Sequence, residues 1–303
     1  MPINEFGFLG NDIKQYENIL KTKYKEVFDL YEEINHFLHT VKFGIELKND
    51  DFQGGTIIGI FCKSLTTFQS IYILFKHYLC NNAENLCRIL FEEMVNIGYC
   101  SLGKDETRIY LSLQAINRLR LIDKVNDEEN RKYFIKNYKE MFFKKKSYNQ
   151  RKSELLNFLN SLGVKEIFSK KGKPKKIILE ERIKKLSSKG IMSYYLTFYN
   201  MVSTGVHSSP DVLERYLIFD ENGLMEEISW GPKAEQCEIG IIFAAINFMI
   251  ISLEYIHKKF SFPKKEDISK FWERTEKLGS KYQYNFEHNE NEGMGSACQD
   301  LTP

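Results

Sequence analysis

The sequence predicts a mainly α-helical protein, a multi-helix bundle with one small β-hairpin near residues 214–230. Three observations lead to this prediction. Apolar residues recur at helical spacing over most of the chain. Only six prolines interrupt its 303 residues, which leaves room for long helices. Two short apolar runs flank Asp220-Glu221-Asn222-Gly223, and such an Asn-Gly turn is typical of a β-hairpin.

Residues 1–50 are expected to form an arm followed by one long helix. In residues 1–10, apolar side chains lie between glycines, so this part reads as a docked arm. From Asn11 to about Lys48 the helical stripe contains Leu20, Tyr24, Val27, Leu30, Tyr31, Ile34, Phe37, Leu38 and Val41. His36 and His39 are three residues apart on it, but no third ligand lies nearby. We therefore expect no metal site and no cofactor.

Residues 55–260 are expected to form the helical core. Residues 57–80 are apolar nearly all round, which predicts a central helix, and Asn81-Asn82 suggests a break before the next helix, which ends near Leu102. A further helix is predicted over 105–125, and Asp127 would cap another one that runs to about Lys146. Gly54-Gly55 is not a phosphate loop, because no strand precedes it and no Lys-Ser or Lys-Thr pair follows.

The last part of the chain continues this pattern. Aromatic residues at helical spacing begin at Tyr194, and this helix is expected to end before Pro210. After the hairpin, residues 233–260 predict a long apolar helix, and residues 261–279 hold a C-terminal helix. Residues 280–303 are rich in Asn, Glu and Gly, which predicts a disordered tail.

Composition bears on compartment and membrane contact. The run Ile239–Ile251 is too short for a typical membrane span and indicates a buried core helix, so no membrane partner is expected. The N-terminus lacks the pattern of a signal peptide. The six cysteines show no CxxC pair and no zinc-like spacing, which predicts buried reduced thiols in a cytoplasmic protein.

The middle of the chain, residues 131–189, is strongly basic. It holds nineteen Lys and Arg against five Asp and Glu, whereas the whole chain has a formal charge of only +2. Its densest runs contain Lys144, Lys145, Lys146, Lys170, Lys171, Lys173, Lys175 and Lys176. The second run also contains Gly and Pro, which predicts a loop. Such a segment attracts phosphate backbones, and the alternative is a solvated lysine-rich face.

One set of side chains suits chemistry on RNA. Arg88 and Glu92 share a helix face, and His207 would lie in the last turn of its helix. Metal-free RNA cleavage needs a base of near-neutral pKa and a cation, which histidine and arginine supply. The alternatives are an Arg88–Glu92 ion pair within the helix and a His207 that bonds the terminal carbonyls. Ser203 has no acid–His partner nearby, so a packing role is expected for it.

The Arg88-x-x-x-Glu92 helix, the Ser203-x-x-x-His207 element, the hairpin and the apolar helix after it resemble a prokaryotic helical family of unknown function. That family in turn resembles the HEPN superfamily, and the resemblance covers roughly residues 55–260. It implies a helical bundle, often dimeric, and in many members a metal-independent ribonuclease. The HEPN motif has an arginine and, after four to six intervening residues, a histidine near a helix end. His207 matches the histidine, whereas Asn200 stands at the arginine position.

Two functional hypotheses follow. The first is an RNA-targeting ribonuclease effector or toxin of prokaryotic antiviral defence, a cytoplasmic homodimer whose partner is a sensor or an antitoxin. The second is a non-catalytic helical scaffold or antitoxin-like binding module that keeps the fold without the motif arginine.

Overall fold

The computed structural model describes residues 13–127, 148–200, 217–228 and 239–282, and these residues are mainly helical, as predicted. The chain divides into two compact units. Unit 1 comprises residues 1–101 and 183–303, and unit 2 comprises residues 102–182. Each unit is described by itself below.

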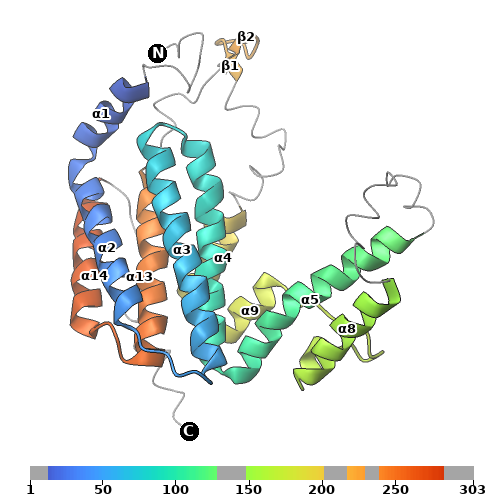
Figure 1. Ribbon diagram of the computed structural model, residues 1–303. Coiled ribbons are helices and arrows are strands. Elements are labelled where there is room, and N and C mark those ends of the chain that lie inside the picture. The colour runs from blue at the N-terminus through green and yellow to red at the C-terminus, as the bar shows by residue number, and fades with distance from the viewer. Residues whose placement is uncertain (1–12, 128–147, 201–216, 229–238, 283–303) are drawn as a thin grey trace. The chain divides into compact units, whose positions relative to one another are not determined.

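The long helices of unit 1 lie side by side. In Figure 1, α2 (Lys25–Gly44), α3 (Phe52–Lys76), α13 (Gly240–Phe260) and α14 (Lys265–Lys281) run roughly alongside one another, and contacts join α13 to the other three. Unit 1 also contains α1 (Ile13–Lys23), α4 (Cys80–Leu102), α10 (Lys189–Tyr194) and the π-helix η3 (Tyr195–Tyr199). Helix α9 (Leu179–Leu186) crosses the boundary between the units.

Helix α13 is the buried centre of unit 1, as its apolar sequence predicts. Every residue from Ile241 to Leu253 is buried, including the polar Asn247 and Ser252. Gly98 of α4 lies close to this helix, since a Cβ at that position would come within 2.6 Å of the Tyr255 ring. By length and composition alone α3 and α13 are each apolar enough to cross a membrane, although a core helix passes the same test. The α13 window is 78% buried, whereas the α3 window is only 39% buried, so the helix predicted as central over 57–80 is in fact partly exposed.

The N-terminal helix predicted as continuous is two helices. Tyr24, with φ −118° and ψ 29°, interrupts the helix between α1 and α2. The predicted stripe is nevertheless buried from Leu20 to Val41, apart from the half-buried Phe37. Of the two histidines, His36 is exposed and His39 contacts Gln69 Nε2 at 2.9 Å.

The boundary between α3 and α4 also differs from the prediction. Helix α3 begins at Phe52, because the Asp51 carboxylate caps it by accepting from the Gly54 N–H at 2.8 Å. The break is not at Asn81-Asn82, which lie in the first turn of α4. It is at Tyr78, whose left-handed φ of 61° lets the Leu79 N–H bond the Leu74 carbonyl. Such a closing turn is an ordinary helix end, with tyrosine where glycine is usual.

The predicted hairpin is present. Strands β1 (Leu217–Phe219) and β2 (Met225–Ile228) pair antiparallel. The Asp220 carboxylate accepts from the Asn222 and Leu224 N–H groups at 2.9 and 2.7 Å, and Gly223 has φ 78°. These bonds explain why the turn lies at this position.

The long helices in the described part of unit 2 are α5 (Lys104–Asn126) and α8 (Tyr148–Ser161). Helix α5 confirms the helix predicted at 105–125. Helices α5 and α8 pack together (Figure 1), and α5 also contacts the short 3-10 helix η2 (Lys165–Ile167). The helix predicted between Asp127 and Lys146 falls almost wholly outside the described residues, as do the N-terminal arm and the tail beyond residue 282.

The cysteines depart from the prediction at one position. Cys62, Cys87 and Cys100 are free thiols, and burial raises the pKa of the Cys87 thiol well above its ordinary value. Cys80, in contrast, is disulfide-bonded, so the expectation of reduced thiols is wrong for this residue.

Candidate functional site

A polar cluster in unit 1 joins Arg88, Glu92 and Tyr199. Arg88 Nη2 donates to the Tyr199 hydroxyl at 2.8 Å, and that hydroxyl donates to Glu92 Oε1 at 2.8 Å. Arg88 Nη2 and Glu92 Oε1 are 3.3 Å apart. Two charge-assisted hydrogen bonds and one ion pair therefore join the three side chains, called the polar cluster below.

The positions of Arg88, Glu92 and Tyr199 follow from the helices that carry them. Arg88 and Glu92 are four residues apart on α4 and so share one face. Tyr199 ends the π-helix, a wider turn that is frequent at functional sites. The Tyr199 ring centroid lies 5.5 Å from that of Phe91, which in turn packs 5.2 Å from Phe248 of α13. The phenol is therefore anchored to the core of unit 1.

Aromatic contacts extend the cluster toward solvent. The rings of Tyr195 and Tyr199 stack with centroids 5.3 Å apart, and the guanidinium carbon of Arg88 lies 4.8 Å from the Tyr199 ring centroid. This distance is within the range of a cation–π interaction. The Arg88 side chain is 22% exposed and that of Glu92 37% exposed, so both groups are partly in contact with solvent.

Burial raises the pKa of Tyr199, an effect that Arg88 opposes and Glu92 reinforces. The phenol therefore stays protonated at neutral pH and can donate to the Glu92 carboxylate. In chemical terms, the cluster offers a carboxylate that can accept a proton and a guanidinium that can stabilise negative charge.

The structure brings together only part of the predicted catalytic set. Arg88 and Glu92 form an ion pair within their helix, which was the alternative to a catalytic role. Asn200 is exposed and its Nδ2 donates to the Leu196 carbonyl one turn back, at 3.4 Å. Ser203 and His207 lie outside the described residues.

Sequence reasoning missed Tyr199. The residue belongs to the aromatic run that begins at Tyr194, so its helical setting was visible in the sequence. Its hydroxyl could have indicated a polar partner, because a buried phenol usually needs a hydrogen-bond partner. Its partners, however, are 107 and 111 residues away along the chain.

The predicted basic loop is a compact turn, called the lysine hairpin below (residues 167–175). The Lys175 N–H bonds the Ile167 carbonyl at 2.7 Å, and the Ser169 N–H bonds the Lys173 carbonyl at 2.8 Å. Gly172, with φ 69°, takes the left-handed position of this turn. Its exposed lysines are Lys170, Lys171, Lys173 and Lys175, and Lys176 follows, half-buried.

One of these lysines has an internal partner. Lys175 Nζ lies 3.0 Å from Glu181 Oε1. For Lys170, Lys171 and Lys173, the described part of the chain contributes no ion pair. The run Lys144, Lys145 and Lys146 lies outside the described residues.

Charge is divided between the two units. Unit 2 contains 21 Lys and Arg against 11 Asp and Glu, a formal excess of ten positive charges. The rest of the chain contains 22 against 30, a deficit of eight. The small net charge of the chain thus conceals one basic unit and one acidic unit.

These features define a mainly helical protein with an Arg–Tyr–Glu cluster on one unit and a lysine hairpin on the other. Residues 55–224 match a family of unknown function (DUF5677), and because this match covers more than half of the chain, the protein belongs to that family. The matched range includes the polar cluster, the lysine hairpin, Ser203 and His207. Neither a curated protein nor a solved structure matches the chain.

Proposed function

We propose that this protein binds RNA and that unit 2 supplies the electrostatic attraction. The lysine hairpin is the observation that carries the proposal. Its backbone hydrogen bonds hold Lys170, Lys171 and Lys173 together on an exposed turn of a unit with ten excess positive charges. Lysines so placed neutralise phosphates and release counterions.

The polar cluster supports a second part of the proposal, RNA cleavage without a metal or cofactor. Arg88 can stabilise the charge that develops on the phosphate, and Glu92 holds the guanidinium in place through their ion pair. Tyr199 holds these two groups in fixed geometry through its hydroxyl. The HEPN resemblance adds His207 as the base, with Ser203 in the same element.

The HEPN resemblance also supports a biological setting for the proposal. We expect a cytoplasmic homodimer that acts as an effector or toxin in prokaryotic defence. A sensor or antitoxin protein would then control it.

A non-catalytic binding module is the second candidate, and one observation favours it. Asn200 stands where the HEPN motif has arginine, and its amide is turned back onto its own helix. Arg88 is at the same time bonded to Tyr199 and paired with Glu92, so a substrate phosphate would have to compete for it. In this reading the cluster stabilises unit 1, and RNA binding through unit 2 remains.

Cleavage of labelled total RNA in excess EDTA tests the first candidate. We expect cleavage by the wild-type chain, and a loss of about 10²–10³-fold in rate for Arg88→Ala and His207→Ala. Arg274→Ala is the matched control, since Arg274 is also an arginine in unit 1 paired with a glutamate, Glu33, at 2.6 Å. RNA binding without any cleavage would support the binding module instead.

A further inference from the structure

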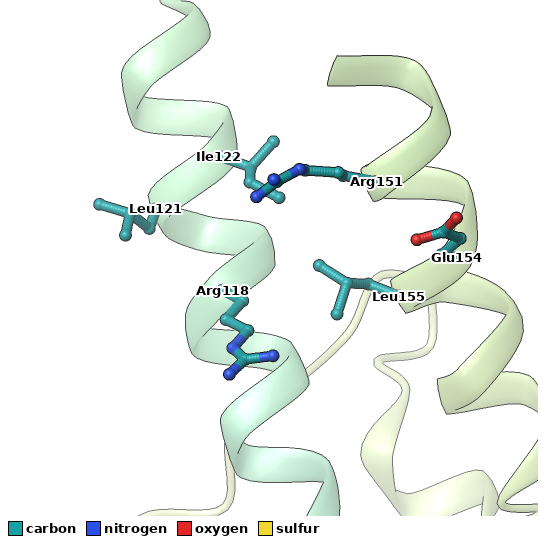
Figure 2. A pocket seen from close by; sticks show the side chains of 6 residues that line it. All are labelled: Arg118, Leu121, Ile122, Arg151, Glu154 and Leu155. Carbon is teal, nitrogen blue, oxygen red and sulfur yellow. The ribbon is translucent and has the colours of Figure 1, made fainter. Parts of the chain in front are cut away.

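Unit 2 contains a cavity of about 570 Å³ between α5 and α8 (Figure 2). Its size is within the range of small-molecule sites. The lining residues are Arg118, Leu121, Ile122, Arg151, Glu154 and Leu155. None of them belongs to the lysine hairpin, so the cavity is a separate feature of the same unit.

The two helices line the cavity in the same way. Arg118 precedes Ile122 by four residues on α5, and Arg151 precedes Leu155 by four residues on α8. At this spacing each arginine shares a face with an aliphatic side chain. In Figure 2 the side chains of Arg151 and Leu155 extend from α8 toward α5. The cavity therefore combines guanidinium groups with aliphatic walls.

The chemistry of the lining selects a kind of ligand. A guanidinium group favours a phosphate, because each one can bind a phosphate through two parallel hydrogen bonds. Leu121, Ile122 and Leu155 favour a flat, weakly polar group such as a nucleobase. Glu154 can accept a hydrogen bond from an exocyclic amino group of a base.

We propose that this cavity holds one nucleotide of a single-stranded RNA, with its phosphodiester at Arg118 and Arg151 and its base against Leu121, Ile122 and Leu155. The inference rests on the proposed RNA binding and adds a base-binding site to it. Helix α5 also contacts η2, whose last residue, Ile167, opens the lysine hairpin. The hairpin would attract the strand, and the cavity would hold one base out of the solvent. Single-stranded RNA suits such a site because its bases are free to leave the stack.

Two arginines on α5 provide the first test. Arg118 lines the cavity, whereas Arg120, two residues further on, does not, and both are exposed. Arg118→Gln and Arg120→Gln therefore remove the same charge from the same helix. With a fluorescent single-stranded RNA and the full chain, we expect about tenfold weaker binding for Arg118→Gln and less than about threefold for Arg120→Gln. Equal losses would overturn the cavity site.

The second test asks whether a base is bound. Wild-type protein should bind an intact strand about tenfold more tightly than an abasic strand of the same length, since both carry the same phosphates. Leu155→Trp, which places an indole in the cavity, should remove this preference, so that the intact strand and the abasic strand bind with equal affinity. A melting curve checks that the variant is folded, and Arg118→Gln, at an exposed position, repeats the test if it is not. A preference that persists in both variants would overturn the site.

Two further measurements separate this inference from the proposed function. Suppose that the wild type binds RNA and that replacing Lys170, Lys171 and Lys173 with Gln weakens this binding, while Arg118→Gln and Arg120→Gln lose the same affinity. RNA binding is then supported, and the cavity site is wrong. If the wild type binds no RNA, both fail. Binding of adenosine monophosphate that depends on Arg118, without RNA binding, would identify a free nucleotide as the ligand and overturn RNA.

Discussion

The two units use their charged side chains in opposite ways. In unit 1, Arg88 is held by Glu92 and Tyr199, and the buried carboxylate of Glu93 is held by Lys63 at 3.1 Å. In unit 2, Lys170, Lys171 and Lys173 extend from an exposed turn. A partly buried charge must find a partner within the protein, because water no longer solvates it fully. An exposed charge has no such need and remains available to a polyanion.

The units also differ in packing. Residues 241–253 of α13 in unit 1 are buried on all sides, and Phe248 among them lies close to Phe91, Tyr194 and Phe198. Helices α5 and α8 of unit 2 leave a cavity between them. Dense packing fixes the geometry of a polar cluster, whereas a cavity leaves room for a ligand.

The largest expected effect tests this difference in packing. Phe248→Ala should lower the free energy of unfolding by about 3–5 kcal/mol, because it removes a fully buried ring. Leu155→Ala, at a half-buried position that lines the cavity, should cost only about 1 kcal/mol. Denaturant titration measures both. Similar losses would show that the two units are packed alike.

Arg88→Ala comes next. We expect a loss of about 2 kcal/mol, because Glu92 and the Tyr199 hydroxyl would lose a partner in a partly buried setting. Arg274→Ala breaks a pair in which both side chains are about half exposed, and should cost less than about 1 kcal/mol. The comparison uses thermal melts of the two variants. A larger cost for Arg274→Ala would mean that the polar cluster does not stabilise unit 1.

Glu93 gives a pH-dependent prediction. Burial raises the pKa of its carboxyl, although Lys63, Thr67 and Ser64 act against this shift. The folded state holds the proton of Glu93 more tightly than the unfolded state does. The protonated carboxyl therefore adds fully to the free energy of unfolding below the pKa of the unfolded state, and this addition is lost as the pH rises through the pKa of the folded state.

Glu93→Gln carries no titrating carboxyl, so its stability relative to the wild type should increase as the pH rises from 4 to 7. Melting curves of the two proteins across this range measure the gain. Glu33→Gln is the control with the opposite sign, since hydrogen bonding to Arg274 lowers the pKa of Glu33. A constant difference between Glu93→Gln and the wild type would show that the buried carboxyl does not titrate differently in the two states.

The smallest effect on stability is expected for the lysine hairpin. Replacing Lys170, Lys171 and Lys173 with Gln should change the free energy of unfolding by less than about 0.5 kcal/mol. The same variant should reduce the slope of log affinity for single-stranded RNA against log salt by about 2. The control replaces Lys264, Lys265 and Lys277, which are exposed on unit 1. Equal changes in slope for both triple variants would mean that the charge of the hairpin has no special role.

The sequence by itself determined the helical class, most helix positions, the hairpin at Asp220–Gly223 and the burial of α13. These features depend on residues a few positions apart, through helical periodicity and turn chemistry, so they can be read along the chain. The same local reasoning brought Arg88 and Glu92 onto one face and identified the basic segment. The roles of Ser203 and His207 stay predictions, as does the HEPN resemblance.

Only the tertiary structure decided which distant groups meet. Tyr199 reaches Arg88 across 111 residues of chain, and the cavity of unit 2 forms where α5 and α8 pack. The break at Tyr24 and the turn at Tyr78 likewise have no local signal of the usual kind, because neither residue is a glycine, proline or asparagine. Such features depend on how helices pack side by side, and a pattern of apolar residues specifies which face is buried but not which partner it contacts.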